Sequence, residues 1–206
     1  MRALFAECEI EVIDLAQAGI EATPEEDDIE VYDTFEENAV AKARYFGQRA
    51  SGRIVVADDS GLEVLALNGE PGVRSRRWSG RRDLEGADLD AANNSLLLER
   101  LRGVDDLRAT FVCAAAWWSD GDSIVVRGEV HGRIVTEPAG AEGFGYDPHF
   151  FSSDLGRTLG VATLVEKQRV SHRSRAFRVL LDAVRARRVL PSADRDAALT
   201  RVADRS

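Results

Sequence analysis

The stretch that decides the fold is IVVADDSGLEVLAL, which runs from Ile54 to Leu67. It opens with apolar residues, as does a strand that is buried on both faces of an α/β sheet. Two adjacent carboxylates, Asp58 and Asp59, then interrupt the apolar run, which resumes after a serine and a glycine. Packing alone gives no reason for charge at the end of a buried strand. Asp58 and Asp59 therefore either cap a turn or hold a charged ligand.

The alternation of side chains along a strand separates the roles of the two carboxylates. Successive strand residues point to opposite faces, so one carboxylate faces a crevice while the other anchors the turn. We predict a strand over residues 53–58, with the pair at its end. In open α/β sheets, ligands bind beyond the carboxyl ends of strands. An Asx turn and a ligand site fit this stretch equally well.

The whole chain has the length and composition of a globular protein. It has 206 residues, of which 44% are apolar and 31% charged, enough for one domain with a real core. No apolar run approaches the roughly 20 residues of a membrane span. Acidic residues interrupt the N-terminus too early for a signal peptide. The formal net charge of −9 disfavours binding to nucleic acid, but it leaves room for a small anionic substrate.

Cysteine usage indicates the compartment. Cys8 and Cys113 are far apart in the sequence and form no CxxC pair. This argues against a disulfide framework or a zinc site, and we expect a protein of the reducing cytoplasm.

Hydrophobic periodicity predicts an α/β fold. We expect strands over residues 9–15, 53–58, 108–118 and 123–135, the last two joined by a hairpin turn. We expect helices over residues 34–51, 88–103 and 171–189. Residues 23–33 form an acidic loop with a short strand at its end, and residues 140–151 form a loop rich in glycine and aromatic residues. Residues 1–190 are expected to make a single domain, and residues 191–206 a loosely attached tail.

Two glutamates and a lysine near the first long helix are candidate site residues. Mg²⁺ takes oxygen ligands, usually one or two carboxylates together with waters and phosphates. Glu30 in the acidic loop and Glu37 in the first helical turn carry such groups. A solvated surface residue is the alternative for Glu30. For Glu37 the alternative is a capping box with Thr34. Lys42, on the same helix, is a weak candidate by itself.

The sequence GFGYD, residues 143–147, offers backbone and rings to a ligand. Glycine lets a ligand approach the main chain closely. Phe144 or Tyr146 can stack on a nucleobase. A tight turn with aromatic residues in the core is the alternative explanation.

The sequence EKQRVSHR, residues 166–173, leads into a helix that Ser171 is placed to cap. Helix N-termini attract anions through unpaired N–H groups and the helix dipole. Each of Lys167, His172 and Arg173 alone fits an ordinary surface residue. The three together favour the binding of an anion.

Five motifs in order resemble one family of enzymes. TFEENAVAKAR, VVADDSGLEV, NGEPGVRSRRWSG, GFGYDPHFF and EKQRVSHR are similar to motifs of the inosine triphosphate pyrophosphatase family, which clears deaminated purine nucleotides such as dITP and XTP. The resemblance runs from about Glu9 to about Val184. It implies an elongated α/β fold of two lobes with a mixed sheet and a central substrate cleft, usually as a homodimer. It also implies Mg²⁺-dependent hydrolysis of ITP, dITP or XTP to the monophosphate and pyrophosphate.

The resemblance further implies a role for each matching residue. Asp59 matches the general base, and Asp59 and Glu30 match the metal ligands. Ser60 matches a serine that contacts the substrate, and Lys42 a lysine near the phosphates. The loop of the base pocket is matched by Phe144, Gly145, Tyr146 and Asp147. The residues that grip the purine and read its 6-keto oxygen are matched by Lys167, His172 and Arg173.

The chain departs from the family's pattern at three places. Family members begin with a strand and a glycine-containing loop that carries Ser/Thr-x-Asn-x-x-Lys and holds the triphosphate. This chain begins MRALFAECEIEVIDL, and we expect Met1 to be an internal methionine of a longer product, so that the domain is N-terminally incomplete. Val161 and Val165 stand where glutamates are common. Arg74 and Arg76 stand where an aromatic residue and an alanine are usual.

Two other functions remain open from the sequence. The chain is alternatively a non-catalytic nucleotide-binding remnant that has lost the phosphate loop. The presence of Asp59, Glu30 and Lys42 argues against this, because a pure binder needs no general base. A hydrolase of pyrimidine nucleotides would turn over dUTP faster than dITP.

Overall fold

The computed structural model describes residues 5–6, 10–21, 23, 26 and 29–189. The predicted tail at residues 191–206 lies outside these residues. The chain divides into two compact units. The first contains Met1–Asp59, Cys113–Gly128 and Arg173–Ser206, and the second contains Ser60–Val112 and Glu129–His172.

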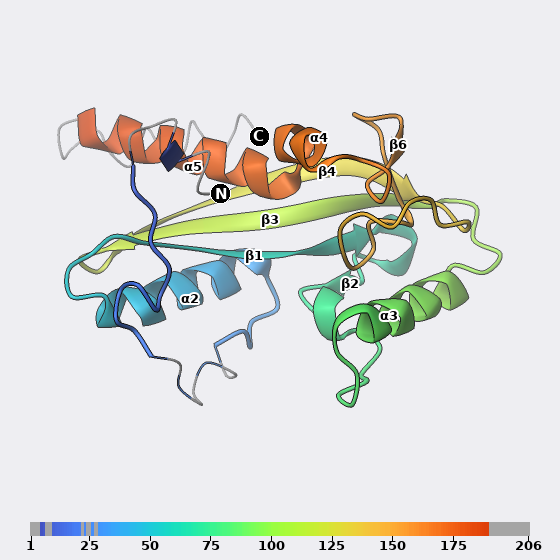
Figure 1. Cartoon of the computed structure of the whole chain (residues 1–206), viewed down its shortest axis with the longest axis horizontal. Helices are drawn as coiled ribbons and strands as arrows, with labels where there is room; N and C mark the ends of the chain where they lie inside the picture. The colour runs from blue at the N-terminus through green and yellow to red at the C-terminus, as the bar shows by residue number, and fades with distance from the viewer. Residues whose placement is uncertain (1–4, 7–9, 22, 24–25, 27–28, 190–206) are drawn as a thin grey trace. The chain divides into compact units, whose positions relative to one another are not determined.

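Six strands and four α-helices make up the described fold, and the predicted α/β class is confirmed (Figure 1). The strands are β1 (Val55–Val64), β2 (Pro71–Gly72), β3 (Arg108–Ser119), β4 (Asp122–Ile134), β5 (Phe150–Ser152) and β6 (Arg157–Thr158). They form one sheet in the order β2-β1-β3-β4-β5-β6. The helices are α2 (Phe35–Arg49), α3 (Gly86–Arg100), α4 (Leu164–Val170) and α5 (His172–Val189), with short 3₁₀ turns η2 (Leu65–Leu67) and η3 (Ser75–Arg77).

In the first unit, α2 and α5 pack on opposite faces of the strands (Figure 1). The reason lies in the alternation along β3. Cys113 and Ala115 share a core cluster with Phe177 of α5. Trp118 packs instead against α2, where a Cβ added to Gly47 would lie 2.0 Å from Trp118 Cε3. Glycine at position 47 is therefore what allows α2 to approach the strands.

The helix predicted at residues 34–51 is confirmed as α2, and so is its N-terminal cap. Thr34 Oγ1 accepts a hydrogen bond from Glu37 N at 3.2 Å and donates one to Glu37 Oε2 at 2.7 Å. Glu37 is thus held in the cap, in agreement with the capping box that was the alternative to a metal ligand at this position. Phe35 and Ala39, which are one helical turn apart, are buried on the face that packs against the strands.

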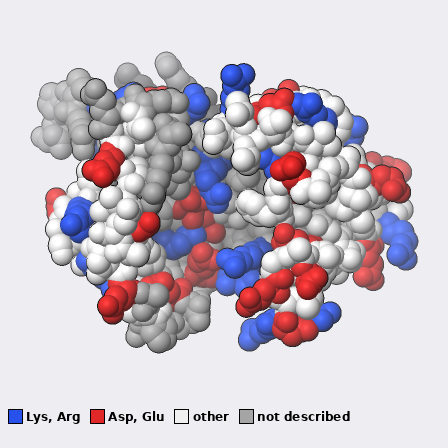
Figure 2. All heavy atoms as spheres, viewed as in Figure 1, with Lys and Arg blue, Asp and Glu red and all other residues white. Residues whose placement is uncertain are grey.

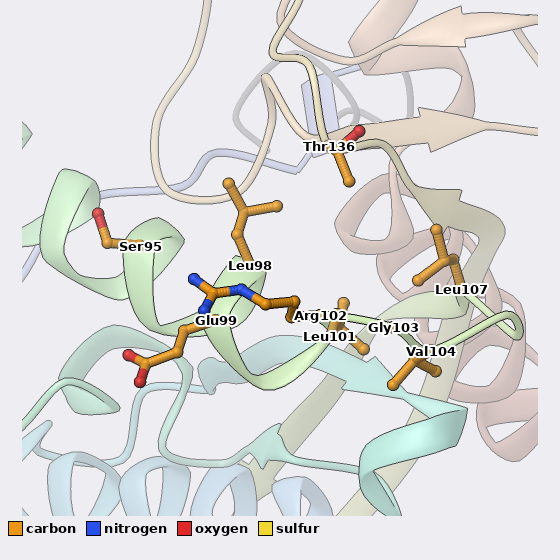
Figure 3. Close-up of a pocket in the computed structure, with 9 residues that line it drawn as sticks. All are labelled: Ser95, Leu98, Glu99, Leu101, Arg102, Gly103, Val104, Leu107 and Thr136. Atoms are coloured by element: carbon orange, nitrogen blue, oxygen red, sulfur yellow. The ribbon is translucent and has the colours of Figure 1, made fainter.

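In the second unit, α3 covers a separate core. Leu97 of α3 is fully buried and packs with Leu62, Phe111 and Phe150. Leu101 belongs to the same core, and Leu98, Val104 and Leu107 pack against it. All four also line an open pocket of about 590 Å³ (Figure 3). Strands β4, β5 and β6 pair antiparallel, with Arg133 opposite Phe151 and Phe151 opposite Thr158.

Two strand predictions near the N-terminus are wrong over the described residues. Residues 10–14 have no regular structure and residues 15–19 form a turn. Asp14 and Gln17 close that turn, because each backbone N–H donates to the side chain of the other. The short strand expected near Asp33 is also absent from the described residues 29–34. There Asn38 holds the peptide groups of Tyr32, taking the place of a neighbouring strand.

The strand predicted at residues 53–58 is longer than expected. Strand β1 continues to Val64, so Asp58 and Asp59 lie in its interior and not at its end. The Asx-turn explanation is thereby excluded. The hairpin between β3 and β4 is confirmed, and its turn residues Asp120 and Gly121 have the positive φ angles of 51° and 85° that tight hairpins require. Helix α4 was not predicted.

The surface carries both signs of charge. In Figure 2, Lys and Arg side chains are interspersed with Asp and Glu side chains on the face shown. Within the described part of the chain, no helix has the length and hydrophobicity needed to cross a membrane.

Candidate active site

Two acidic side chains of the first unit converge on one lysine. Lys42 Nζ lies 2.8 Å from Glu30 Oε1 and 3.3 Å from Asp59 Oδ1. The second oxygen of Asp59 accepts a hydrogen bond from Asn38 Nδ2 at 3.1 Å. The structure therefore brings together the predicted residues Glu30, Lys42 and Asp59, and it adds Asn38 to them.

The spacing along α2 explains why Asn38 and Lys42 reach the same carboxylate. They lie one helical turn apart, so their side chains share a face of the helix. That face also carries the buried residues Phe35 and Ala39 and is turned toward β1. Asn38 is only 1% exposed, which is unusual for an amide. Sequence reasoning missed it, although a polar residue one turn before a candidate lysine, on an apolar face, was a usable signal.

The environment of Asp59 makes its carboxylate more basic than usual. Burial is the largest effect and raises its pKa, and the nearby charge of Glu30 raises it further. Lys42 and the hydrogen bond from Asn38 act in the opposite direction, and the net shift is upward. A carboxylate with a raised pKa is better able to accept a proton near neutral pH.

The donor set at this point suits a magnesium ion. The ammonium group of Lys42 already places a positive charge between the two carboxylates. Within the described ranges, no group of three or more potential metal-binding side chains gathers. Glu30 and Asp59 would thus offer the one or two carboxylates that Mg²⁺ usually takes, since waters and phosphates commonly supply its other ligands. A closed structural metal site does not fit these residues.

Asp58 holds a different cation on the other face of β1. Arg173 Nε donates to Asp58 Oδ2 at 2.8 Å, and Cys113 Sγ lies 3.7 Å from the same oxygen. Burial is the largest single effect on the pKa of Arg173 and lowers it, but the charge and hydrogen bond of Asp58, together with the contact to Cys113, raise it, and the net pKa is raised. Arg173 lies in the first turn of α5. The prediction that the two aspartates face opposite sides is confirmed: Asp59 reaches Lys42 of α2 and Asp58 reaches Arg173 of α5.

In the second unit, the loop at residues 143–147 separates its two aromatic rings. Phe144 is 74% exposed, whereas Tyr146 is buried in the core. The hydroxyl of Tyr146 donates to Ser75 O at 2.8 Å. Burial, and next the charge of Asp90, raises the pKa of Tyr146, so this hydroxyl stays protonated. Phe144 is therefore the ring of this loop that can stack on a ligand.

Asp147 and Lys167, both predicted to bind substrate, bind each other. Lys167 Nζ lies 2.8 Å from Asp147 Oδ2, and the same oxygen accepts from Phe144 N at 3.1 Å. Both side chains are largely buried, with exposures of 16% and 12% for Lys167 and Asp147. Gly143 lies directly against the pair. The observed contacts give both residues a role in holding the loop.

The remaining predicted residues of this unit are Ser60, Gly145 and His172. Ser60 lies in β1 directly after Asp59 and is half-buried. His172 begins α5, and its ring stacks on Phe111 with centroids 5.0 Å apart and an interplanar angle of 12°. Gly145 is hydrogen-bonded at both its N–H and its C=O to side chains of α3.

With this geometry in place, comparison with known proteins identifies the class. The family model described as the Ham1 family matches residues 1–183. The chain therefore belongs to the Ham1 family, and the resemblance proposed from its motifs is confirmed.

A curated relative and two solved structures agree with this assignment. The chain is 53% identical over 167 residues to the dITP/XTP pyrophosphatase of Mycolicibacterium paratuberculosis, covering 80% of this chain and 79% of the relative. It is 42% identical to a Mycobacterium abscessus crystal structure titled nucleoside-triphosphatase / dITP/XTP pyrophosphatase, with a TM-score of 0.67 and coverage of 87% and 92%. A HAM1 protein from Coxiella burnetii gives a TM-score of 0.76 at 33% identity, with coverage of 90% and 91%. The prediction of an enzyme of the nucleoside triphosphate pyrophosphatase class is confirmed at this level.

Proposed function

We propose that this chain hydrolyses the deaminated purine nucleoside triphosphates ITP, dITP and XTP to the monophosphate and pyrophosphate, with Mg²⁺ as cofactor. One observation carries the proposal: Glu30 and Asp59 converge on Lys42, 2.8 Å and 3.3 Å from its ammonium nitrogen. Two carboxylates around one cation suit a polyphosphate substrate only if a metal ion offsets their charge. The curated relative named above is a dITP/XTP pyrophosphatase.

The residues that converge on Lys42 have different roles in the proposed reaction. Asp59, which lies buried beside Lys42, accepts the proton of the attacking water. Asn38 orients that carboxylate by donating to one of its oxygens. Lys42 places its positive charge near the phosphates. Glu30 and Asp59 would hold the Mg²⁺ ion, which would supply the positive charge that offsets the phosphates and polarises the phosphorus.

Recognition of the base falls to a second set of residues. Phe144, exposed at the tip of its loop, offers a stacking surface for the purine. Arg173 and His172 supply donors for a 6-keto oxygen, and Ser60 contacts the substrate. Adenine presents an amino group there, and a donor facing a donor leaves a polar group unpaired, at about 1–3 kcal/mol each. Two such mismatches give roughly a hundredfold discrimination or more.

We also propose a homodimer in the cytoplasm. The homodimer follows from the family resemblance alone. The cytoplasmic location is supported by cysteine usage, since Cys113 is a buried thiol.

The decisive test is the substitution Asp59→Asn. Loss of the general base should lower turnover of dITP about 10²- to 10⁴-fold, while nucleotide binding remains. Glu37→Gln is the matched control, because Glu37 lies nearby but is held in the helix cap. Removing Mg²⁺ with EDTA should abolish turnover by the parent protein. An Asp59→Asn protein that keeps more than a tenth of parental turnover at saturating Mg²⁺ contradicts the assignment.

The same assay separates the two alternatives. A non-catalytic nucleotide-binding protein would release no pyrophosphate from ITP with or without Mg²⁺. A pyrimidine hydrolase would turn over dUTP faster than dITP.

A further inference from the structure

Two polar side chains of α3 hold the loop that carries Phe144. Gly145 N donates to Asp90 Oδ2 at 2.7 Å, and Asn94 Nδ2 donates to Gly145 O at 2.9 Å. Asp90 and Asn94 lie one turn apart, on the same face of the helix. The amide of Asn94 has a fixed orientation, because only its nitrogen can donate to a carbonyl oxygen. Gly145 is thus held at both its backbone N–H and its backbone C=O.

The loop needs such support because its own backbone is permissive. Gly143 and Gly145 have positive φ angles of 88° and 62°, where glycine is favoured. Phe144 lies between them with its side chain largely in solvent. Its N–H is held by Asp147 Oδ2, and the residue that follows it is held by Asp90 and Asn94. The position of the exposed ring is therefore set by contacts made to the backbone on both sides of it.

We propose that Asp90 and Asn94 are positioning residues that fix Phe144 for stacking on the purine base of the substrate. The inference rests on the proposed function, in which Phe144 contacts the base. Neither residue touches the reacting atoms. The bond to Asp90 is short and its acceptor is a carboxylate, which makes it the stronger of the two contacts.

If Asp90 and Asn94 hold the loop before the substrate binds, their replacement should change KM more than kcat. If the loop is held before the substrate arrives, the cost of ordering it is already met in the folded protein. Releasing the loop transfers that cost to binding, so KM rises while kcat changes little. A single hydrogen bond corresponds to a change of about 2- to 12-fold in KM.

The experiment compares Asp90→Ala and Asn94→Ala with the parent, using ITP turnover and thermal melting. Asp88→Ala is the matched control, because Asp88 is an exposed residue of the same helix. Asp90→Asn should recover much of the loss, since its side-chain oxygen can still accept from Gly145 N. If Asp90→Ala does not fold, Asn94→Ala decides alone. A KM for ITP that is unchanged in Asn94→Ala overturns the proposal.

A double-mutant cycle shows whether the effect passes through Phe144. Phe144→Ala is combined with Asn94→Ala, and we expect the double variant to raise KM no more than Phe144→Ala does alone. Independent, multiplying effects on KM would mean that Asn94 supports the fold only and would overturn the inference. A Phe144→Ala protein with parental KM would instead refute the contact between Phe144 and the base, which is part of the proposed function.

Discussion

Replacing Gly143 by alanine separates two ways in which the base-contacting loop is held. Gly143 has a φ of 88°, so any side chain there is strained. A Cβ at this position would also lie 2.1 Å from Asp147 Oδ2 and 2.1 Å from Lys167 Nζ. Alanine therefore adds backbone strain and forces the ion pair apart. At Gly145, where φ is 62°, an added Cβ has nothing within 4 Å, so alanine there adds strain alone.

The two substitutions differ in whether they also remove the contribution of the ion pair between Asp147 and Lys167 to the free energy of unfolding. Positive φ costs alanine about 1–2 kcal/mol at either position. Separating a largely buried pair that stays able to reach water adds about 1–2 kcal/mol. For a chain of this size, 1 kcal/mol shifts the melting temperature by about 2–4 °C. Gly143→Ala should therefore melt about 2–8 °C below Gly145→Ala.

Thermal melting by circular dichroism in the absence of nucleotide measures this difference. Lys167→Met is a useful third variant, because it has no ion pair for Gly143→Ala to separate, so that adding Gly143→Ala to it should cost less than in the parent. Equal melting temperatures for Gly143→Ala and Gly145→Ala would refute the reasoning. They would mean that the pair between Asp147 and Lys167 contributes nothing to holding the loop.

Three further outcomes are expected. In metal-free protein, a carboxyl pKa raised on folding contributes stability at low pH that is lost as the pH rises through that pKa. Denaturant titration should therefore show Asp59→Asn gaining stability relative to the parent as the pH rises from 3.8, the ordinary pKa of an aspartate carboxyl group, toward the raised pKa of Asp59. Gly47→Ala should destabilise the first unit by about 1–3 kcal/mol, because its Cβ overlaps the ring of Trp118, and an unchanged melting temperature would argue against that packing. Arg173→Met should lower turnover of ITP much more than that of ATP, and an equal loss for both would show that Arg173 does not read the base.

The elements that were predicted correctly are those whose sequence signals lie in residues close together in the chain. The cap at Thr34 and the apolar face with Phe35 and Ala39 define α2 in the sequence as well as in the structure. The hairpin turn at Asp120 and Gly121 needs positive φ, and few residue types adopt it readily. These features depend on residues close together in the chain, so periodicity and turn chemistry were sufficient.

The errors arise where distant residues decide the outcome. Strand β1 runs through Asp58 and Asp59 because each charge is matched by a cation from a helix far away in the sequence, Lys42 and Arg173. Without those partners in view, two adjacent carboxylates resemble the end of a strand. Asn38 was missed for the same reason, since its acceptor, Asp59, comes 21 positions later.

The individual site residues divide along the same line. Asp59, Glu30 and Lys42 were candidates from the sequence itself and took their roles from the resemblance, and the structure places them together. The contact between Lys167 and Asp147 could not be read from the chain, because it depends on how a loop folds back on a helix.

Because Asp58 and Asp59 face opposite sides of β1, the strand cannot gain or lose one residue before them without moving each carboxylate to the other side. Substitutions that keep the strand extended leave each carboxylate on its own side. A single codon inserted or deleted between Val55 and Asp58 would rotate the remainder of the strand relative to its neighbours and exchange the two sides. Asp58 would then be presented to Lys42, and Asp59 to Arg173. We therefore expect viable variants of this strand to differ from one another in residue type while sharing the same number of residues.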